Sequence, residues 1–172
     1  MEILETKLED VLIFKPEIYR DFRGLNMELY NHKRYTNAIH ERLNKKINFV
    51  LDKVAVSSKN VLRGIHGDLK TWKLVSCLKG KIYFVVVNCN EESQDFGEWE
   101  SFDLSDTNRN QVLVPPKYGN AHLVLSDEAI FHYKWSKYYT PKQFSYKWND
   151  PKFNISWPIK NPILSKRDSQ SE

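Results

Sequence analysis

The stretch TWKLVSCLKGKIYFVVVNC, residues 71–89, contains two apolar runs that the tripeptide KGK separates. Each run has the length of a strand, and the second is rich in Val, Ile, Phe and Tyr, the residues that β-strands favour. The tetrapeptide LKGK, residues 78–81, predicts a hairpin turn between two buried strands. The middle of the chain is therefore expected to form β-structure.

Further segments of the same kind recur along the chain. Each is short, alternates or clusters apolar residues, and is bounded by Gly, Pro, Asn or Asp. These segments are residues 11–19, 47–58, 61–66, 97–104, 111–116, 121–126 and 129–136. Short strands at regular spacing, with few helices, predict a β-sandwich or β-barrel. No repeat or linker interrupts the chain, so we expect one domain spanning residues 1–172, with a tail that frays from about residue 169.

One segment predicts a helix. Residues 31–46, NHKRYTNAIHERLNKK, place Tyr35, Ile39 and Leu43 at intervals of four, and Asn31 is a suitable N-cap.

Composition excludes several classes of function. The formal net charge of +4 comes from scattered residues, and no basic run interleaved with aromatics marks a nucleic-acid groove. The longest apolar run, near Tyr83 to Val87, is far too short to span a membrane, and the acidic, mixed start MEILETKLED is no secretory signal. Cys77 and Cys89 lie inside apolar runs, as buried thiols do in a reducing compartment. We expect a cytoplasmic protein that binds neither nucleic acid nor membrane.

Few residues indicate chemistry by themselves. His66 ends the segment VLRGIH, and Tyr133 shares one strand face with Phe131 and Trp135. Either residue, taken alone, is more typical of packing or of the surface. No second histidine lies near His66 to form a metal site, His122 stands alone, and motifs for phosphate loops, dinucleotides or nucleophilic serines are absent. Metal-free acid–base chemistry and plain binding remain.

An ordered series of motifs runs through nearly the whole chain. It comprises DFRG at 21–24, ELY at 28–30, SSKNVLRGIH at 57–66, KLVSCLKGKIYFVVV at 73–87, VLVPP at 112–116, HLVLSDEAIFHYK at 122–134, WNDP at 148–151, ISWP at 155–158 and PILSKRD at 162–168. In this order and spacing the series resembles the dTDP-4-dehydrorhamnose 3,5-epimerase family. The resemblance implies an all-β, cupin-type jelly-roll barrel with one or two short helices. It also implies a homodimeric isomerase that needs no metal and no cofactor, with a nucleoside-diphosphate 4-keto sugar as its substrate.

The resemblance assigns catalytic roles to four residues. His66 matches the family's base, Asp168 the carboxylate paired with it, and Tyr133 the acid on the opposite face of the sugar. Lys73 matches the lysine beside the C4 oxygen. These residue types suit the reaction, because histidine has an ordinary pKa of about 6.5, a carboxylate orients its ring, and an ammonium stabilises an enolate oxygen.

The same resemblance assigns substrate-binding residues. Arg23 and Arg63 match arginines that hold the diphosphate, while Glu28 and Tyr139 match positions lining the nucleotide site. Simple alternation would place Arg63 and His66 on opposite faces of their strand. We therefore predict a bend or bulge at Gly64, or the end of the strand there.

Departures from the family pattern fall around the substrate. Leu51 and Lys53 replace polar nucleotide-side residues, Asn120 replaces a histidine, and His122 stands where an apolar residue is usual. The segments IHGD at 65–68 and TWKLV at 71–75 are similar to the branch that acts on GDP-linked 4-keto heptoses in capsule synthesis. The expected substrate is accordingly a GDP-4-keto-6-deoxy or 4-keto heptose, whose extra hydroxyl Asn120, His122 or Asp68 would bind.

Three other functions remain open. The first is a C3-only epimerase or ketoisomerase of the same barrel class, and the second is a 3,5-epimerase of dTDP-4-keto-6-deoxyhexoses. The third is a non-catalytic sugar-binding barrel. The joint presence of His66, Lys73, Tyr133 and Asp168 favours an enzyme, since a binding module does not need the whole set.

Overall fold

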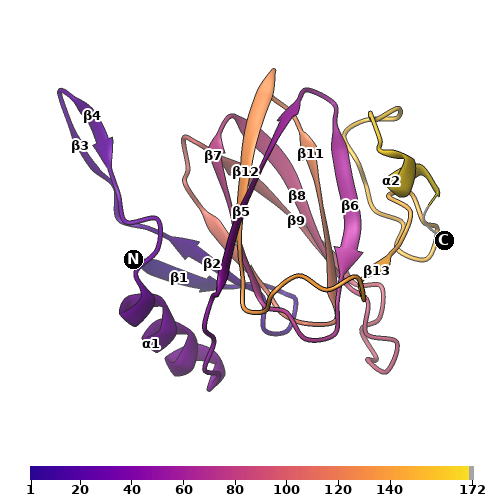
Figure 1. Ribbon diagram of the computed structural model, residues 1–172, viewed down its shortest axis with the longest axis horizontal. Coiled ribbons are helices and arrows are strands. Elements are labelled where there is room, and N and C mark those ends of the chain that lie inside the picture. The colour runs from indigo at the N-terminus through magenta and orange to yellow at the C-terminus, as the bar shows by residue number, and fades with distance from the viewer. Residues whose placement is uncertain (171–172) are drawn as a thin grey trace.

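A computed structural model of the 172-residue chain describes residues 1–170. Within them the chain forms two large antiparallel sheets, a separate two-stranded hairpin and two short helices (Figure 1). The six-stranded sheet has the order β1-β2-β10-β7-β12-β5, and the five-stranded sheet has the order β13-β6-β11-β8-β9. The elements are β1 Glu2–Glu5, β2 Leu12–Lys15, β3 Tyr19–Asp21, β4 Gly24–Asn26, α1 His32–Leu43, β5 Leu51–Ser58, β6 Leu62–Gly67, β7 Lys73–Lys79, β8 Lys81–Asn88, β9 Trp99–Ser105, β10 Gln111–Val114, β11 Tyr118–Val124, β12 Glu128–Trp135, β13 Phe144–Ser145 and α2 Lys166–Gln170.

The two large sheets pack face to face around one main core. Val75 of β7 and Phe131 of β12 come from the six-stranded sheet, and Phe84 and Val86 of β8 come from the five-stranded sheet. All four side chains are buried, as the period-2 pattern of their strands predicts. The predicted all-β jelly-roll barrel with one or two short helices is thus confirmed.

The turn at residues 78–81 does not close a hairpin, so that prediction is wrong. Strand β7 pairs with β10 and β12, whereas β8 pairs with β11 and β9. At Gly80, with a φ of 76°, the chain passes from one sheet to the other. Each strand lies between two neighbours in its own sheet, and of these neighbours only β9 follows directly along the chain. A local turn motif cannot reveal this.

Helix α1 covers the outer face of the six-stranded sheet. The Asn31 side chain accepts a hydrogen bond from the Arg34 backbone N–H, and Tyr35 and Ile39 are buried against that sheet. The helix ends three residues earlier than predicted, because Asn44 adopts a left-handed conformation and caps it.

The first two residues of the tail that is expected to fray belong to helix α2. Ser169 and Gln170 belong to α2, and Asp168 beside them is only 3% exposed. The Leu62 backbone N–H donates to the carbonyl of Ile163, which anchors the preceding segment to β6. Residues 171–172, the end of the expected frayed tail, lie outside the described residues. The segment before residue 171 has no apolar periodicity, and it is attached to the barrel by backbone hydrogen bonds and by the buried Asp168 carboxylate.

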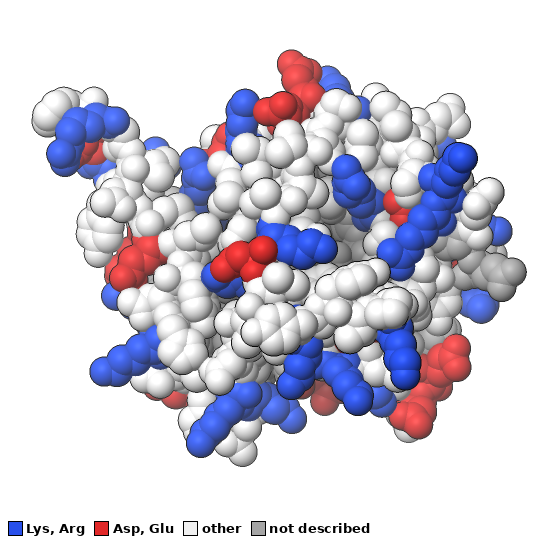
Figure 2. Space-filling view, in the orientation of Figure 1, with Lys and Arg blue, Asp and Glu red and all other residues white. Residues whose placement is uncertain are grey.

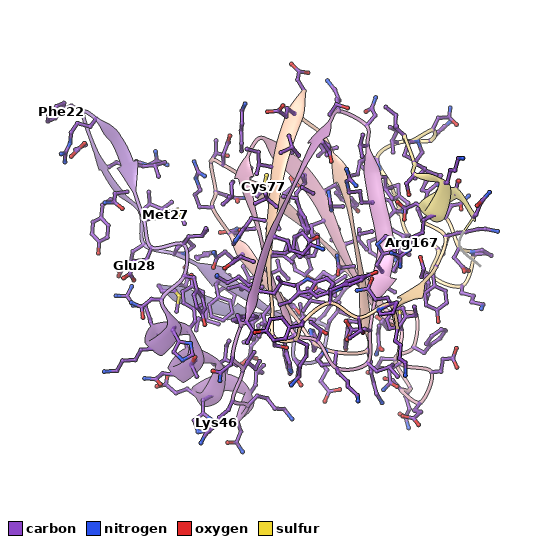
Figure 3. All side chains as sticks on the ribbon, in the orientation of Figure 1. Phe22, Met27, Glu28, Lys46, Cys77 and Arg167 are labelled. Carbon is purple, nitrogen blue, oxygen red and sulfur yellow. The ribbon has the colours of Figure 1, made fainter. Side chains whose placement is uncertain are left out.

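The β3–β4 hairpin projects from the body of the protein (Figures 1 and 3). Every residue of its two strands is exposed, and at its tip Phe22 is 98% exposed. Tyr19 and Leu25 add further exposed apolar surface. This arm makes no core of its own.

Both cysteines are buried and unpaired, as predicted. Burial raises the pKa of Cys77 to about 11 and that of Cys89 to about 12, so both remain thiols at neutral pH. Among residues 1–170, no helix is long and apolar enough to cross a membrane.

Candidate active site

A cavity of about 400 Å³ opens between the two sheets. Figure 2 shows a hollow in this face of the molecule, with Lys and Arg side chains around it. Its lining is a mixture of aromatic, basic and polar groups. The lining residues are Lys53, Ala55, Arg63, His66, Lys73, Val75, Asn120, His122, Phe131, Tyr133, Trp135, Tyr139, Gln143, Ser165, Arg167 and Asp168.

A bulge at Gly64 brings Arg63 and His66 to the same cavity. Gly64 has a φ of 120°, and the register between β6 and β11 shifts between Asn120 and His122. A Cβ atom at Gly64 would lie 2.5 Å from the carbonyl oxygen of Asn120, so only glycine fits. The predicted bulge is confirmed, and it removes the conflict with simple alternation.

His66 and Asp168 form a close pair at one side of the cavity. The distance between His66 Nε2 and Asp168 Oδ1 is 2.6 Å, and Ser165 Oγ donates to the other carboxylate oxygen at 2.8 Å. Burial alone would raise the pKa of Asp168, but the contacts with His66 and Ser165 outweigh it and lower that pKa. The carboxylate therefore stays ionised and fixes the ring. Within residues 1–170, Nδ1 of His66 has no hydrogen-bond partner in the protein, so a ligand in the cavity can approach it.

Lys73 places an ammonium group at the bottom of the same site. Its Nζ donates to Asn120 Oδ1 at 2.7 Å and to the His66 carbonyl oxygen at 3.3 Å, and it lies 5.6 Å from the centroid of the Trp135 ring. Burial lowers the pKa of Lys73 to about 8. At neutral pH most molecules still carry the charge, which can stabilise a developing oxyanion.

Tyr133 reaches the cavity from the opposite sheet. It lies on β12 of the six-stranded sheet, whereas His66 lies on β6 of the five-stranded sheet. Its ring packs against Phe131 and Trp135, with centroid distances of 5.0 and 5.9 Å, and Lys53 Nζ lies 5.8 Å from its centroid. A ligand between the sheets would meet the histidine on one face and the phenol on the other.

Four of the predicted binding residues also line this cavity. Asn120 and His122 come from β11, Arg63 from β6, and Tyr139 from the segment after β12. The Tyr139 ring is 55% exposed and lies 6.1 Å from that of Trp135, so it forms an aromatic rim.

Arg23 and Glu28 lie away from the cavity within one chain. Arg23 sits at the hairpin tip, where its guanidinium pairs with Asp21. Glu28 lies at the base of the hairpin and pairs with Arg34 of α1 at 3.0 Å (Figure 3). A single chain therefore does not bring these two predicted residues together with His66.

Sequence reasoning missed several lining residues and gave no contact for another. Lys53, named above only as a departure on the nucleotide side, faces Tyr133 directly in the register of β5 and β12. Ser165 stands three residues before Asp168, a spacing typical of a hydroxyl that caps a helix start. Gln143 and Arg167 carry no such signal, because they come from segments without periodicity; Figure 3 shows Arg167 reaching from α2 towards the barrel.

Comparison with known proteins accounts for this arrangement. A family model described as dTDP-4-dehydrorhamnose 3,5-epimerase matches residues 5–172. The chain belongs to the dTDP-4-dehydrorhamnose 3,5-epimerase family. It is therefore an isomerase of the epimerase class, with its cavity where two jelly-roll sheets meet.

Three relatives of this epimerase bear on its function. The dTDP-4-dehydrorhamnose 3,5-epimerase of Shigella flexneri is 38% identical over 172 residues, covering 98% of this chain and 93% of that protein. The crystal structure of a dTDP-6-deoxy-D-glucose-3,5-epimerase from Legionella pneumophila, in complex with dTDP-4-keto-L-rhamnose, superposes with a TM-score of 0.91 at 36% identity, covering 99% and 90% of the two chains. A dTDP-4-dehydrorhamnose 3-epimerase of Streptomyces niveus is 31% identical over 175 residues, covering 99% and 83%.

Proposed function

We propose that this epimerase inverts carbons 3 and 5 of a nucleoside-diphosphate 4-keto sugar by proton transfer. One observation carries the proposal: the His66–Asp168 pair and Tyr133 enter one cavity from opposite sheets, with the Lys73 ammonium beside them. Inversion needs a base on one face of the carbon and an acid on the other, and this arrangement provides both.

The steps follow from the positions of these groups. His66 Nδ1 takes the proton from a carbon next to the C4 ketone, and the electron pair moves to the C4 oxygen as an enolate. Lys73 stabilises that oxygen by charge and hydrogen bonding. Asp168 supports the imidazolium that forms. Tyr133 then returns a proton to the same carbon from the opposite face, and the C4 ketone is restored.

The nucleotide is proposed to be dTDP. The Shigella and Legionella relatives both carry dTDP sugars in their names, which favours dTDP over the GDP-linked heptose that the segments near His66 suggest. Of the substrates considered above, a dTDP-4-keto-6-deoxyhexose is therefore the better supported one. The exposed Tyr139 ring is suited to stack on the nucleobase, and Arg63 is suited to bind the diphosphate.

A second function, C3-only epimerisation, also has specific support. The Streptomyces niveus relative is named a 3-epimerase, although its identity to this chain is lower than that of the Shigella enzyme. Tyr133 serves as an acid in either reaction, so its presence does not separate the two.

We propose further that the enzyme is a homodimer in which the β3–β4 hairpin of one copy reaches the cavity of the other. The hairpin exposes Phe22, Tyr19 and Leu25, and its tip carries Arg23, which the cavity of its own chain does not receive. Apolar side chains on a projecting arm favour burial against a second surface. This arrangement would bring the predicted diphosphate-binding arginine to the site.

Deuterium incorporation tests the proposed reaction. The enzyme is incubated in D₂O with dTDP-4-keto-6-deoxyglucose, and label is located by mass spectrometry and NMR, with enzyme-free and His66→Ala samples as controls. We expect deuterium at C3 and at C5 in the native sample alone. Label at C3 only would reduce the activity to 3-epimerisation. No enzyme-dependent label, with either this sugar or a GDP-linked 4-keto sugar, would leave a non-catalytic sugar-binding barrel.

A further inference from the structure

His122 is a buried polar side chain without a hydrogen-bond partner. Its side chain is 3% exposed and lines the cavity, and neither ring nitrogen makes a hydrogen bond within the described residues. The ring stacks on Phe131 with centroids 4.0 Å apart and an interplanar angle of 17°, so its plane is fixed. A buried polar group left unsatisfied in this way is costly unless a ligand completes it.

The two other residues expected to bind an additional hydroxyl, Asn120 and Asp68, do not share this property. Asn120 Oδ1 accepts from Lys73 Nζ, so this side chain already has a partner in the protein. Asp68 Oδ1 accepts from the backbone N–H groups of Lys70 and Thr71, and Asp68 does not line the cavity. Of the three residues considered for an additional hydroxyl, only His122 keeps its full hydrogen-bonding capacity.

The surroundings of His122 define the kind of group it can bind. Burial, the largest cause, and the nearby Arg63 and His66 lower the pKa of His122 to about 3, although Asp168 acts in the opposite direction. The imidazole is therefore neutral, with one N–H donor and one acceptor nitrogen. A hydroxyl group, itself both donor and acceptor, matches it, whereas a phosphate or a carboxylate would meet no charge on the ring.

The position of His122 along β11 indicates which hydroxyl. In the register of β6 and β11, Asn120 lies opposite His66, at the level of Lys73, and His122 lies opposite Arg63. Two residues along a strand span about 7 Å. If the C4 oxygen lies at Lys73 and the diphosphate at Arg63, as the proposed function requires, the sugar ring spans these two levels. The hydroxyl nearest the diphosphate end of the ring is the one on C2.

We propose that His122 is a substrate-binding residue that hydrogen-bonds the C2 hydroxyl of the sugar and selects against sugars that lack it. The inference rests on the proposed function, since it takes the orientation of the sugar from Lys73 and Arg63. His122 anchors the ring beside the reacting C3 carbon without taking part in proton transfer.

Binding measurements with matched ligands and matched variants test this assignment. Dissociation constants of dTDP, dTDP-glucose, dTDP-2-deoxyglucose and dTDP-6-deoxyglucose are measured for the native enzyme, for His122→Phe and for His122→Gln. Phe keeps the stack on Phe131 without a polar atom, and Gln restores a donor and an acceptor. The native enzyme is expected to bind dTDP-2-deoxyglucose about tenfold more weakly than dTDP-glucose, a ratio typical of one good hydrogen bond.

The dissociation constant of dTDP-2-deoxyglucose divided by that of dTDP-glucose should fall to about two or less in His122→Phe. It should recover at least in part in His122→Gln. The dissociation constant of dTDP alone should be the same in all three proteins, which shows that the variants are folded. The ratio of the constants of dTDP-6-deoxyglucose and dTDP-glucose should also stay the same. An unchanged ratio for the 2-deoxy sugar in His122→Phe, or a change confined to the 6-deoxy sugar, would overturn the assignment. If that result came with native deuterium exchange at C3 and C5, only this inference would fail. Failure of the native enzyme to bind any dTDP sugar would overturn both this inference and the proposed nucleotide.

Discussion

His66 Nε2 lies 2.6 Å from Asp168 Oδ1, and this contact joins the end of β6 to the short C-terminal helix α2. The helix is only five residues long and has no apolar face of its own. Its place is fixed by the buried Asp168 and by Ser165, which bonds both the carboxylate and the backbone N–H of Asp168. The orientation of the proposed base therefore depends on the last turn of the chain.

Replacement of Asp168 by Asn should slow proton transfer strongly. The amide keeps the shape of the side chain but removes the charge that orients His66 and supports its imidazolium. We expect the rate of deuterium incorporation to fall about 100-fold or more, with little change in the dissociation constant of dTDP. Ser165→Ala is the matched control, because it removes only one hydrogen bond to the same carboxylate and should cost less. Native exchange rates in Asp168→Asn would contradict the assigned role.

The same carboxylate predicts a dependence of stability on acid pH. The pKa of Asp168 is lowered in the folded protein from its ordinary value of 3.8, since contacts with His66 and Ser165 outweigh burial. A carboxyl group with a depressed folded pKa contributes stability above its unfolded pKa and loses it as pH falls through the folded pKa. Urea midpoints of native protein and Asp168→Asn should therefore converge as pH falls from 6 to below 3.8. A gap that stays constant over this range would show that ionisation of Asp168 does not stabilise the fold.

Lys73 predicts the alkaline limit of the activity. Burial lowers its pKa to about 8, so the ammonium is lost as pH rises through that value, and with it the stabilisation of the enolate oxygen. The exchange rate should fall above pH 8 in the native enzyme. Lys73→Met should lower the rate about 100-fold at pH 7. Lys73→Arg keeps a charge that does not titrate in this range and should move the alkaline decline upward. An unchanged pH profile in Lys73→Arg would exclude Lys73 as the titrating group.

Much of the barrel could be predicted because each strand can be recognised from its own residues. Alternation and β-branched residues mark β5 to β12 to within a few residues, and Asn31 marks the start of α1. The bulge at Gly64 was predictable from a conflict: Arg63 and His66 had to reach one site, and a glycine lay between them.

Pairing between distant segments was not predictable from local pattern. The turn at Gly80 carries the signals of a hairpin, yet β7 pairs with β10 and β12 while β8 pairs with β11 and β9. Asp168 lies in a polar tail, and its partner His66 is about a hundred residues earlier in the sequence, so no local pattern reveals the contact. Arg23 was assigned from the family motif alone, and the folded chain places it on an exposed arm.

Gly64 and Gly24 form a matched pair for testing the bulge. Both have a positive φ, 120° and 126°, so alanine strains the backbone at each. A Cβ at Gly64 would collide with the backbone of Asn120 and Ala121, whereas a Cβ at Gly24 meets nothing within 4 Å. Gly24→Ala should lower the free energy of unfolding by about 1–2 kcal/mol and Gly64→Ala by more than about 3 kcal/mol, measured by urea denaturation. Equal losses at the two sites would mean that the close approach at Gly64 does not constrain the fold.

Mixing two inactive variants tests the proposed sharing of the site between copies. Arg23→Ala keeps His66, and His66→Ala keeps Arg23. If the hairpin of one copy serves the cavity of the other, a mixed dimer contains one site with both residues intact. After unfolding and refolding together in equal amounts, about half of the dimers are mixed and each has one active site of two, so deuterium exchange should recover to about a quarter of the native rate. Each variant refolded alone should stay inactive or weak, and light scattering should give the mass of a dimer throughout. A mixture no more active than the average of its two components, with dimers formed, would place Arg23 outside the partner's site, because the intact residues would then never meet in one cavity.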